Sequence, residues 1–144
     1  MSYITEIKNM SKKQEIICDL ARELAQKSDM NKSKHGAVVV NGKKIIGMGY
    51  NRYCQNKNCY TIHAEVDAIK DALNNYGKNY VNNAQLYVIR ISKEDINPTN
   101  RKVRKIDPYI NNISRTNFRL SKPCLECTNF IIKHNISMVY YSID

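Results

Sequence analysis

The sequence predicts an α/β fold in which helices pack on one mixed sheet of about four strands. Short β-rich runs alternate with amphipathic stretches of helical spacing in the order α-β-β-α-β-α-β. Two of the runs flank an Asn-Gly pair, which is typical of an antiparallel hairpin. The last two runs are separated by a helix, which favours a parallel pair with a right-handed crossover. The sheet should therefore contain both strand directions.

The first helix and the hairpin have clear local signals. Ser11 and Gln14 form a capping box, which predicts a helix start. Apolar residues at helical spacing follow it: Ile16, Ile17, Leu20, Ala21, Leu24 and Ala25. The runs 36–40 and 45–48 surround Asn41-Gly42 and form the predicted hairpin.

The second half of the chain supplies two more helices and two more strands. A helix should begin near 61–63, and a strand should span Gln85–Ile91. A third helix should run from Pro123 or Cys124 to about His134, before a last strand at 138–141. This last strand should lie at an exposed sheet edge. Because edges are usually covered, we expect a homo-oligomer.

The length of 144 residues predicts a single domain over 1–144 with one insertion at about 92–117. The insertion contains Pro98 and Pro108 and has no sustained periodicity. A stretch of this length without regular structure is usually functional or mobile.

Basic charge is concentrated in the same part of the chain. The protein has 23 Lys and Arg against 13 Asp and Glu, a net charge of +10. Half of this excess falls within 92–122. A basic balance favours anionic partners such as nucleotides or nucleic acid, although a solvated basic surface is an equal alternative.

The five cysteines indicate a reducing compartment. The N-terminal residues are too polar for a secretory signal, and no apolar run is long enough to span a membrane. We therefore expect a cytoplasmic protein without a membrane partner, in which cysteine serves metal binding or catalysis more often than disulfide formation.

Two short motifs indicate a metal site. His63-Ala64-Glu65 and Pro123-Cys124-Leu125-Glu126-Cys127 both fall at predicted helix starts. His63, Cys124 and Cys127 supply imidazole and thiolate ligands, which suit zinc and leave one position for water. The partial positive charge of a helix N-terminus should favour the thiolate form of both cysteines.

Glu65 is expected to lie beside the metal without binding it. A carboxylate in this position can take a proton from water and return it to a substrate. Either motif alone is weak evidence, whereas both together in this order are typical of zinc nucleobase deaminases.

With these motifs the sequence resembles the cytidine and deoxycytidylate deaminase superfamily over about 11–141, apart from the segment 92–117. The resemblance implies a cytidine-deaminase-like three-layer α/β/α fold, His63, Cys124 and Cys127 as zinc ligands, and Glu65 as the proton shuttle. It also implies substrate contacts from Asn51 and Ala64.

The resemblance is nearest to the deoxycytidylate deaminase branch, because the first ligand is His63 and the helix continues as Val66-Asp67-Ala68. That branch usually has Asn where this chain has Asp67. Relatives also lack a long insertion before Pro-Cys, usually have Ser or Glu where Lys122 stands, and usually continue to a fifth strand.

The basic insertion allows three interpretations. It can bind a 5′-phosphate, for which Arg115 and Arg119 are the best candidates because they lie nearest the metal motif. It can follow a nucleic-acid backbone through segment 92–122, or it can be a solubilising loop. Cys54 and Cys59 are a further open case, either free thiols or ligands of a second, structural zinc together with His35 or His134.

The predicted function is zinc-dependent hydrolytic deamination of a cytosine base in a dCMP- or CMP-like nucleotide. One alternative is a tRNA adenosine or polynucleotide deaminase, which would bind nucleic acid with a steep salt dependence. Another is a catalytically inactive, zinc-containing nucleic-acid-binding module, for which Glu65 would have no use.

Overall fold

The structure is a computed structural model, and it describes residues 3–6, 10–54, 61–91, 118–119 and 121–142. Several sequence predictions concern residues outside these ranges, namely the insertion at 92–117 with Arg115, and the possible metal ligand Cys59.

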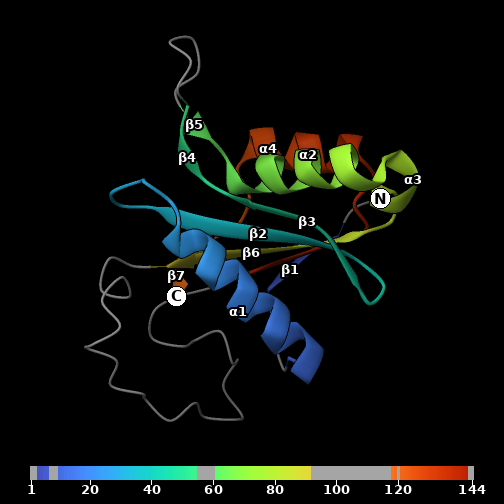
Figure 1. Cartoon of the computed structure of the whole chain (residues 1–144), viewed down its shortest axis with the longest axis horizontal. Helices are drawn as coiled ribbons and strands as arrows, with labels where there is room; N and C mark the ends of the chain where they lie inside the picture. The colour runs from blue at the N-terminus through green and yellow to red at the C-terminus, as the bar shows by residue number, and fades with distance from the viewer. Residues whose placement is uncertain (1–2, 7–9, 55–60, 92–117, 120, 143–144) are drawn as a thin grey trace.

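A mixed sheet runs through the middle of the molecule (Figure 1). The four predicted strands are β2 (Lys34–Asn41), β3 (Lys44–Tyr50), β6 (Gln85–Ile91) and β8 (Met138–Tyr141). β2 pairs antiparallel with both β3 and β6, whereas β6 and β8 are parallel, as the helix between them requires. The predicted α/β fold with a mixed sheet is confirmed.

Two further strands extend this sheet. β1 (Tyr3–Glu6) pairs parallel with β8, and β7 (Phe118–Arg119) pairs antiparallel with β6. The strand order is β1-β8-β6-β2-β3. The sequence prediction that β8 forms an exposed edge is therefore wrong, because β1 supplies the missing backbone partner. Homo-oligomer formation loses this support and stays a prediction.

Helices cover both faces of the sheet and give three layers (Figure 1). α1 (Lys12–Gln26) lies on one face, and α2 (Ala64–Tyr76) and α4 (Leu125–Lys133) lie on the other. The short α3 (Lys78–Val81) follows α2. Within the described ranges, none of the helices has the length and apolarity needed to cross a membrane.

Local signals explain why α1 begins where it does. The Gln14 backbone N–H donates to the Ser11 hydroxyl at 3.2 Å, and the Gln14 side chain accepts from the Ser11 backbone N–H at 3.0 Å. This is the predicted capping box. The buried face consists of Ile17, Cys18, Ala21, Leu24 and Ala25. Ile16 is 62% exposed, because it lies beside this face rather than on it.

The two faces of the sheet build separate cores, because side chains alternate along each strand. Val38, Val40 and Ile89 pack under α1. Ala37, Val39 and Val88 pack under the other helices, on the face that also holds the predicted metal motifs.

α2 lies directly on β3, because Gly47 and Gly49 place no side chain between them. A Cβ atom at Gly49 would lie 2.4 Å from the backbone nitrogen of Ala68, and one at Gly47 would lie 2.3 Å from its carbonyl oxygen. This close approach fixes the first turns of α2 relative to the sheet.

Two carboxylates of α2 also bind the outer edge of β3. Asp67 accepts from the Tyr50 backbone N–H at 3.2 Å, and Asp71 accepts from the Met48 backbone N–H at 2.9 Å. Their spacing of one helical turn matches two outward-facing N–H groups of the strand. Beyond β3, the short strands β4 (Arg52–Tyr53) and β5 (Thr61–Ile62) pair and lead to α2.

Candidate metal and catalytic centre

The N-termini of α2 and α4 bring three metal-ligating side chains together. His63 is the N-cap of α2, Cys124 is the N-cap of α4, and Cys127 lies in the first turn of α4. The His63 Nδ1 atom is 3.1 Å from Cys127 Sγ and 3.8 Å from Cys124 Sγ. The three ligand atoms all lie within 4.8 Å of one another.

This geometry fits a tetrahedral zinc ion. With Zn–S near 2.3 Å and Zn–N near 2.0 Å, two ligand atoms of one tetrahedron are separated by about 3.5–3.8 Å. The observed spacings bracket that range. Imidazole and thiolate are also the donors that zinc prefers. The described residues contain no other such group of three.

Burial changes the expected state of Cys127. Desolvation raises the pKa of its thiol, and the neighbouring Glu65 carboxylate and Cys124 add to this effect. In the metal-free protein, burial therefore opposes the effect that the helix N-terminus is expected to have on Cys127. A bound divalent cation reverses this balance, because it stabilises the thiolate directly.

Glu65 lies next to the three ligands without belonging to their group. It is only 5% exposed, and Cys127 Sγ donates to its Oε2 atom at 3.7 Å. Burial raises the pKa of this carboxyl group, and its hydrogen bond to its own backbone, His63 and Cys127 oppose the rise only in part. A buried carboxyl with a raised pKa can hold a proton and release it near neutral pH.

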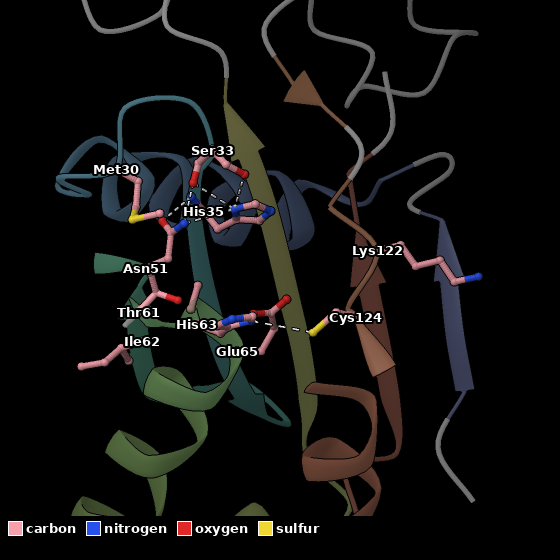
Figure 2. Close-up of a pocket in the computed structure, with 11 residues that line it drawn as sticks. Met30, Ser33, His35, Asn51, Thr61, Ile62, His63, Glu65, Lys122 and Cys124 are labelled. Carbon is pink, nitrogen blue, oxygen red and sulfur yellow. Dashed lines mark hydrogen bonds between the residues drawn. The ribbon is translucent and has the colours of Figure 1, made fainter. Parts of the chain in front are cut away.

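These residues form part of the lining of a cavity of about 250 Å³. Figure 2 shows His63, Glu65 and Cys124 on one part of its wall and Ser33, His35 and Asn51 on another. The predicted substrate-contact residues Asn51 and Ala64 both line this cavity.

Hydrogen bonds to Ser33 and His35 fix Asn51 in the cavity wall. Its Oδ1 atom accepts from the His35 backbone N–H at 2.7 Å, and its Nδ2 atom donates to the Ser33 carbonyl. Its backbone N–H donates to the His35 carbonyl at 3.1 Å. This side chain therefore joins the start of β2 to the end of β3, in addition to any contact with a substrate.

The model of the cytidine and deoxycytidylate deaminase zinc-binding region matches residues 11–143. The chain belongs to this deaminase family. The match includes both metal motifs and the residues of the cavity.

Solved structures agree on the fold of this deaminase. The dCMP deaminase from the cyanophage S-TIM5 in apo form is 19% identical, with 92% of this chain and 84% of that chain covered and a TM-score of 0.60. The same enzyme in complex with dCMP and dUMP is 18% identical, with 92% of this chain and 82% of that chain covered and a TM-score of 0.59. A guanine deaminase from Bacillus subtilis is 19% identical, with 93% of this chain and 65% of that chain covered and a TM-score of 0.55. None of the curated protein sequences matches this chain.

Asp67, which departs from the deoxycytidylate pattern that the sequence resembles, has a defined partner. Arg52 binds its two carboxylate oxygens at 2.6 and 2.9 Å. Asp67 in turn raises the pKa of Arg52. Because both side chains are partly exposed, this pair orders the entry to α2 more than it stabilises the fold.

The basic residues divide into three cases. Lys122 lines the cavity; the sequence marked it as a basic residue and as a departure from the family pattern before Pro-Cys, but not as a substrate contact. Arg119 lies in β7 directly opposite Arg90 of β6, which is itself paired with His35 of β2. Paired residues share a face of a sheet, so Arg90 lies on the same face as His35, which lines the cavity. Arg115 lies outside the described residues.

Sequence reasoning missed most of the cavity wall opposite the metal group. His35 was considered only as a ligand of a second zinc with Cys54 and Cys59, and Ser33, Met30 and Thr61 were not singled out. The available signal was the position of His35 directly before the buried Gly36–Val40 run, at the same strand end as Asn51.

Proposed function

We propose that this chain catalyses the zinc-dependent hydrolytic deamination of a cytosine base in a mononucleotide of the dCMP or CMP type. The observation that carries this proposal is the buried carboxyl of Glu65 beside a His–Cys–Cys group in the wall of a small cavity. A structural metal site has no need for such a carboxyl, whereas hydrolysis requires one to move protons.

His63, Cys124 and Cys127 would hold the zinc ion. When bound, zinc acts as a Lewis acid that lowers the pKa of water to about 7. Its positive charge also balances the two thiolates and the carboxylate that the fold gathers there.

Glu65 is the proposed proton shuttle. It takes one proton from the attacking water and delivers it to the ring nitrogen. It then transfers the second proton, from the hydroxyl now on C4, to the departing amine. A C4–O bond forms, the C4–N bond breaks, and the uracil product and ammonia result. The buried position of Glu65 keeps bulk water from competing for this proton.

A mononucleotide fits the size and charge of the site. The cavity of about 250 Å³ is slightly smaller than the roughly 300–1,000 Å³ range of small-molecule sites, which favours one base over a longer ligand. Lys122 places positive charge next to the cavity, although Figure 2 shows its ammonium group pointing away from His63, Glu65 and Cys124. Arg119 and Arg115 remain the proposed additional phosphate contacts.

Ammonia release from a substrate panel tests this proposal. The zinc-loaded protein is incubated with cytidine, CMP, dCMP, dCTP, adenosine, guanine, single-stranded DNA and tRNA. We expect turnover of CMP or dCMP and none by a Glu65→Gln protein prepared in the same way. Turnover of tRNA or DNA alone would establish the polynucleotide alternative, and a blank panel would indicate an inactive zinc-containing module.

A further inference from the structure

His35 presents a polar ring atom to the cavity that the proposed chemistry does not use. It is the second residue of β2 and lies on the sheet face occupied by α2 and α4, with its side chain in the cavity wall (Figure 2). It is not one of the three grouped metal ligands. Its role therefore has to come from the contacts of the imidazole itself.

The ring is fixed through one nitrogen. The Nδ1 atom lies 3.3 Å from the Ser33 carbonyl oxygen, 3.4 Å from the Ser33 hydroxyl and 3.4 Å from Asn51 Nδ2. Asn51 also binds both backbone groups of His35. Its Oδ1 atom accepts from the His35 N–H, and its backbone N–H donates to the His35 carbonyl. A ring held in this way is already oriented before a ligand arrives, so that binding costs little further conformational entropy.

The free nitrogen is an acceptor. Desolvation by burial lowers the pKa of His35 to about 4, with smaller contributions in the same direction from Arg90 and His63 and an opposing one from Ser33. The ring is therefore neutral near pH 7 and carries one proton. The Ser33 carbonyl can only accept a hydrogen bond, so we assign the ring proton to Nδ1, which donates to it. The Asn51 amide nitrogen is itself a donor, so with this tautomer it binds the Ser33 carbonyl and not the ring. Nε2 then offers a lone pair, and it has no hydrogen-bond partner among the described residues.

The chemistry of cytosine restricts what this acceptor can bind. In a cytosine nucleotide the base has a single donor group, the 4-amino group, because N3 and O2 are acceptors. On the proposed function, that amino group is the one removed beside Glu65 and His63. The donors that remain are the hydroxyl groups of the sugar.

We propose that His35 is a positioning residue that accepts a hydrogen bond from a sugar hydroxyl of the substrate through Nε2. This proposal rests on the deamination of a cytosine nucleotide proposed above. It assigns to the Ser33–His35–Asn51 wall the task of holding the sugar while the base meets the metal group. Such a contact discriminates against a substrate without the hydroxyl, because that substrate leaves the acceptor unpaired.

The contact is tested by removing the sugar hydroxyl from the substrate and, separately, the imidazole from residue 35. Steady-state kinetics compare CMP, dCMP and 2′,3′-dideoxy-CMP for the wild-type protein and His35→Phe. In this series of substrates, we expect the wild-type kcat/KM to fall about 3- to 10-fold between the last substrate that has the bound hydroxyl and the first that lacks it. The fall should come mainly from a higher KM. The His35→Phe protein should lose this discrimination and process all three substrates at the lower level.

Two further variants separate positioning from a general loss of structure. His35→Gln retains an acceptor oxygen and should restore part of the discrimination between substrates. Met30→Leu replaces one apolar side chain of the same wall by another and should discriminate between the substrates as the wild type does. Thermal melting of each variant shows that it is folded.

Equal discrimination in the wild type and His35→Phe would overturn the inference while leaving deamination intact. A folded wild type without activity on any cytosine nucleotide would overturn the proposed function and this inference with it.

Discussion

Glu65 combines a stability cost with a chemical use. Its carboxyl is almost fully buried, and its nearest described partner is a thiol at 3.7 Å rather than a cation. An ionised carboxylate in such a place is unfavourable unless a positive charge compensates it. A zinc ion on His63, Cys124 and Cys127 would supply this charge, and the same carboxyl would then carry protons during the reaction.

Glu65→Gln should abolish turnover while leaving metal binding in place. The amide has nearly the same shape but cannot take a proton from water, so we expect kcat to fall by about 10²- to 10⁴-fold. The measurement combines ammonia release with zinc content per protein molecule. Full activity in a zinc-loaded Glu65→Gln protein would contradict the assigned role, and loss of zinc would show that Glu65 acts as a ligand.

The raised pKa of Glu65 also predicts how the stability of the metal-free protein depends on pH. A carboxyl whose pKa is raised by folding binds its proton more tightly in the folded state than in the unfolded state. Stability is therefore lost as pH rises from the ordinary value of 4.5 through the raised value. Metal-free Glu65→Gln lacks this loss, so its melting temperature relative to the wild type should increase as the pH rises above 4.5.

Melting curves of both metal-free proteins at a series of pH values test this expectation. A wild type that gains stability relative to Glu65→Gln as pH rises would contradict it. Zinc should reduce or reverse the difference, because the cation favours the charged carboxylate.

At the scale of elements, the junction of α2 and β3 determines where the site forms. The two glycines of β3 let the helix rest on the strand backbone, and the two aspartates of α2 bind the strand edge. His63 and Glu65 lie at the start of this helix. A small shift of α2 along β3 would therefore move both relative to Cys124 and Cys127.

Gly49→Ala should cost both stability and activity. The new methyl group would lie 2.4 Å from the Ala68 backbone nitrogen and 2.8 Å from the Ala64 carbonyl oxygen, so the helix itself has to move. We expect a loss of about 3 kcal/mol, at the upper end of the range for overpacking. Denaturant unfolding and ammonia release measure the two effects.

Met48→Ala is the matched control on the same strand. The Met48 side chain is 44% exposed and lies on the opposite face, so its removal should change stability by about 0.5 kcal/mol or less. Equal effects of the two substitutions would show that α2 does not depend on close contact with β3.

The elements that the sequence predicted are those with local signals. The Asn-Gly turn, the Ser11–Gln14 capping box and the Pro-Cys helix start each act within a few residues, and all three appear in the structure. β1, β4, β5 and β7 have two to four residues each and exist through their partners, which periodicity cannot reveal. The group of His63, Cys124 and Cys127 could be predicted because these residue types are specific. The place of His35 could not, because only folding brings it to Ser33 and Asn51.

At the scale of the whole molecule, the proposed zinc site connects two helices on one face of the sheet. α2 supplies His63 and α4 supplies both cysteines, whereas the sheet supplies His35 and the chain just after β3 supplies Asn51. On the opposite side of β8, β1 closes the edge that the strand would otherwise expose. The sheet therefore acts as a fixed support, and the metal would join the parts that rest on it.

Zinc removal should destabilise the entire domain as well as stop turnover. A ligand that binds only the folded state adds about 4 kcal/mol when present at 1,000 times its dissociation constant. For a chain of this size each kcal/mol changes the melting temperature by about 3–4 °C, so stoichiometric zinc should raise it by about 10 °C or more. Cys127→Ser should lose this response, because it removes one of the three ligands and the thiolate that zinc favours.

Cys54→Ser is the matched control, since Cys54 lies outside the group of three ligands. It should keep the full response of the melting temperature to zinc and bind one zinc ion per chain. An equal loss in both cysteine variants would indicate a metal site that includes Cys54, and the α2–α4 site would then not be the one that zinc stabilises. A melting temperature that does not change with zinc in the wild type would contradict the proposed metal centre altogether.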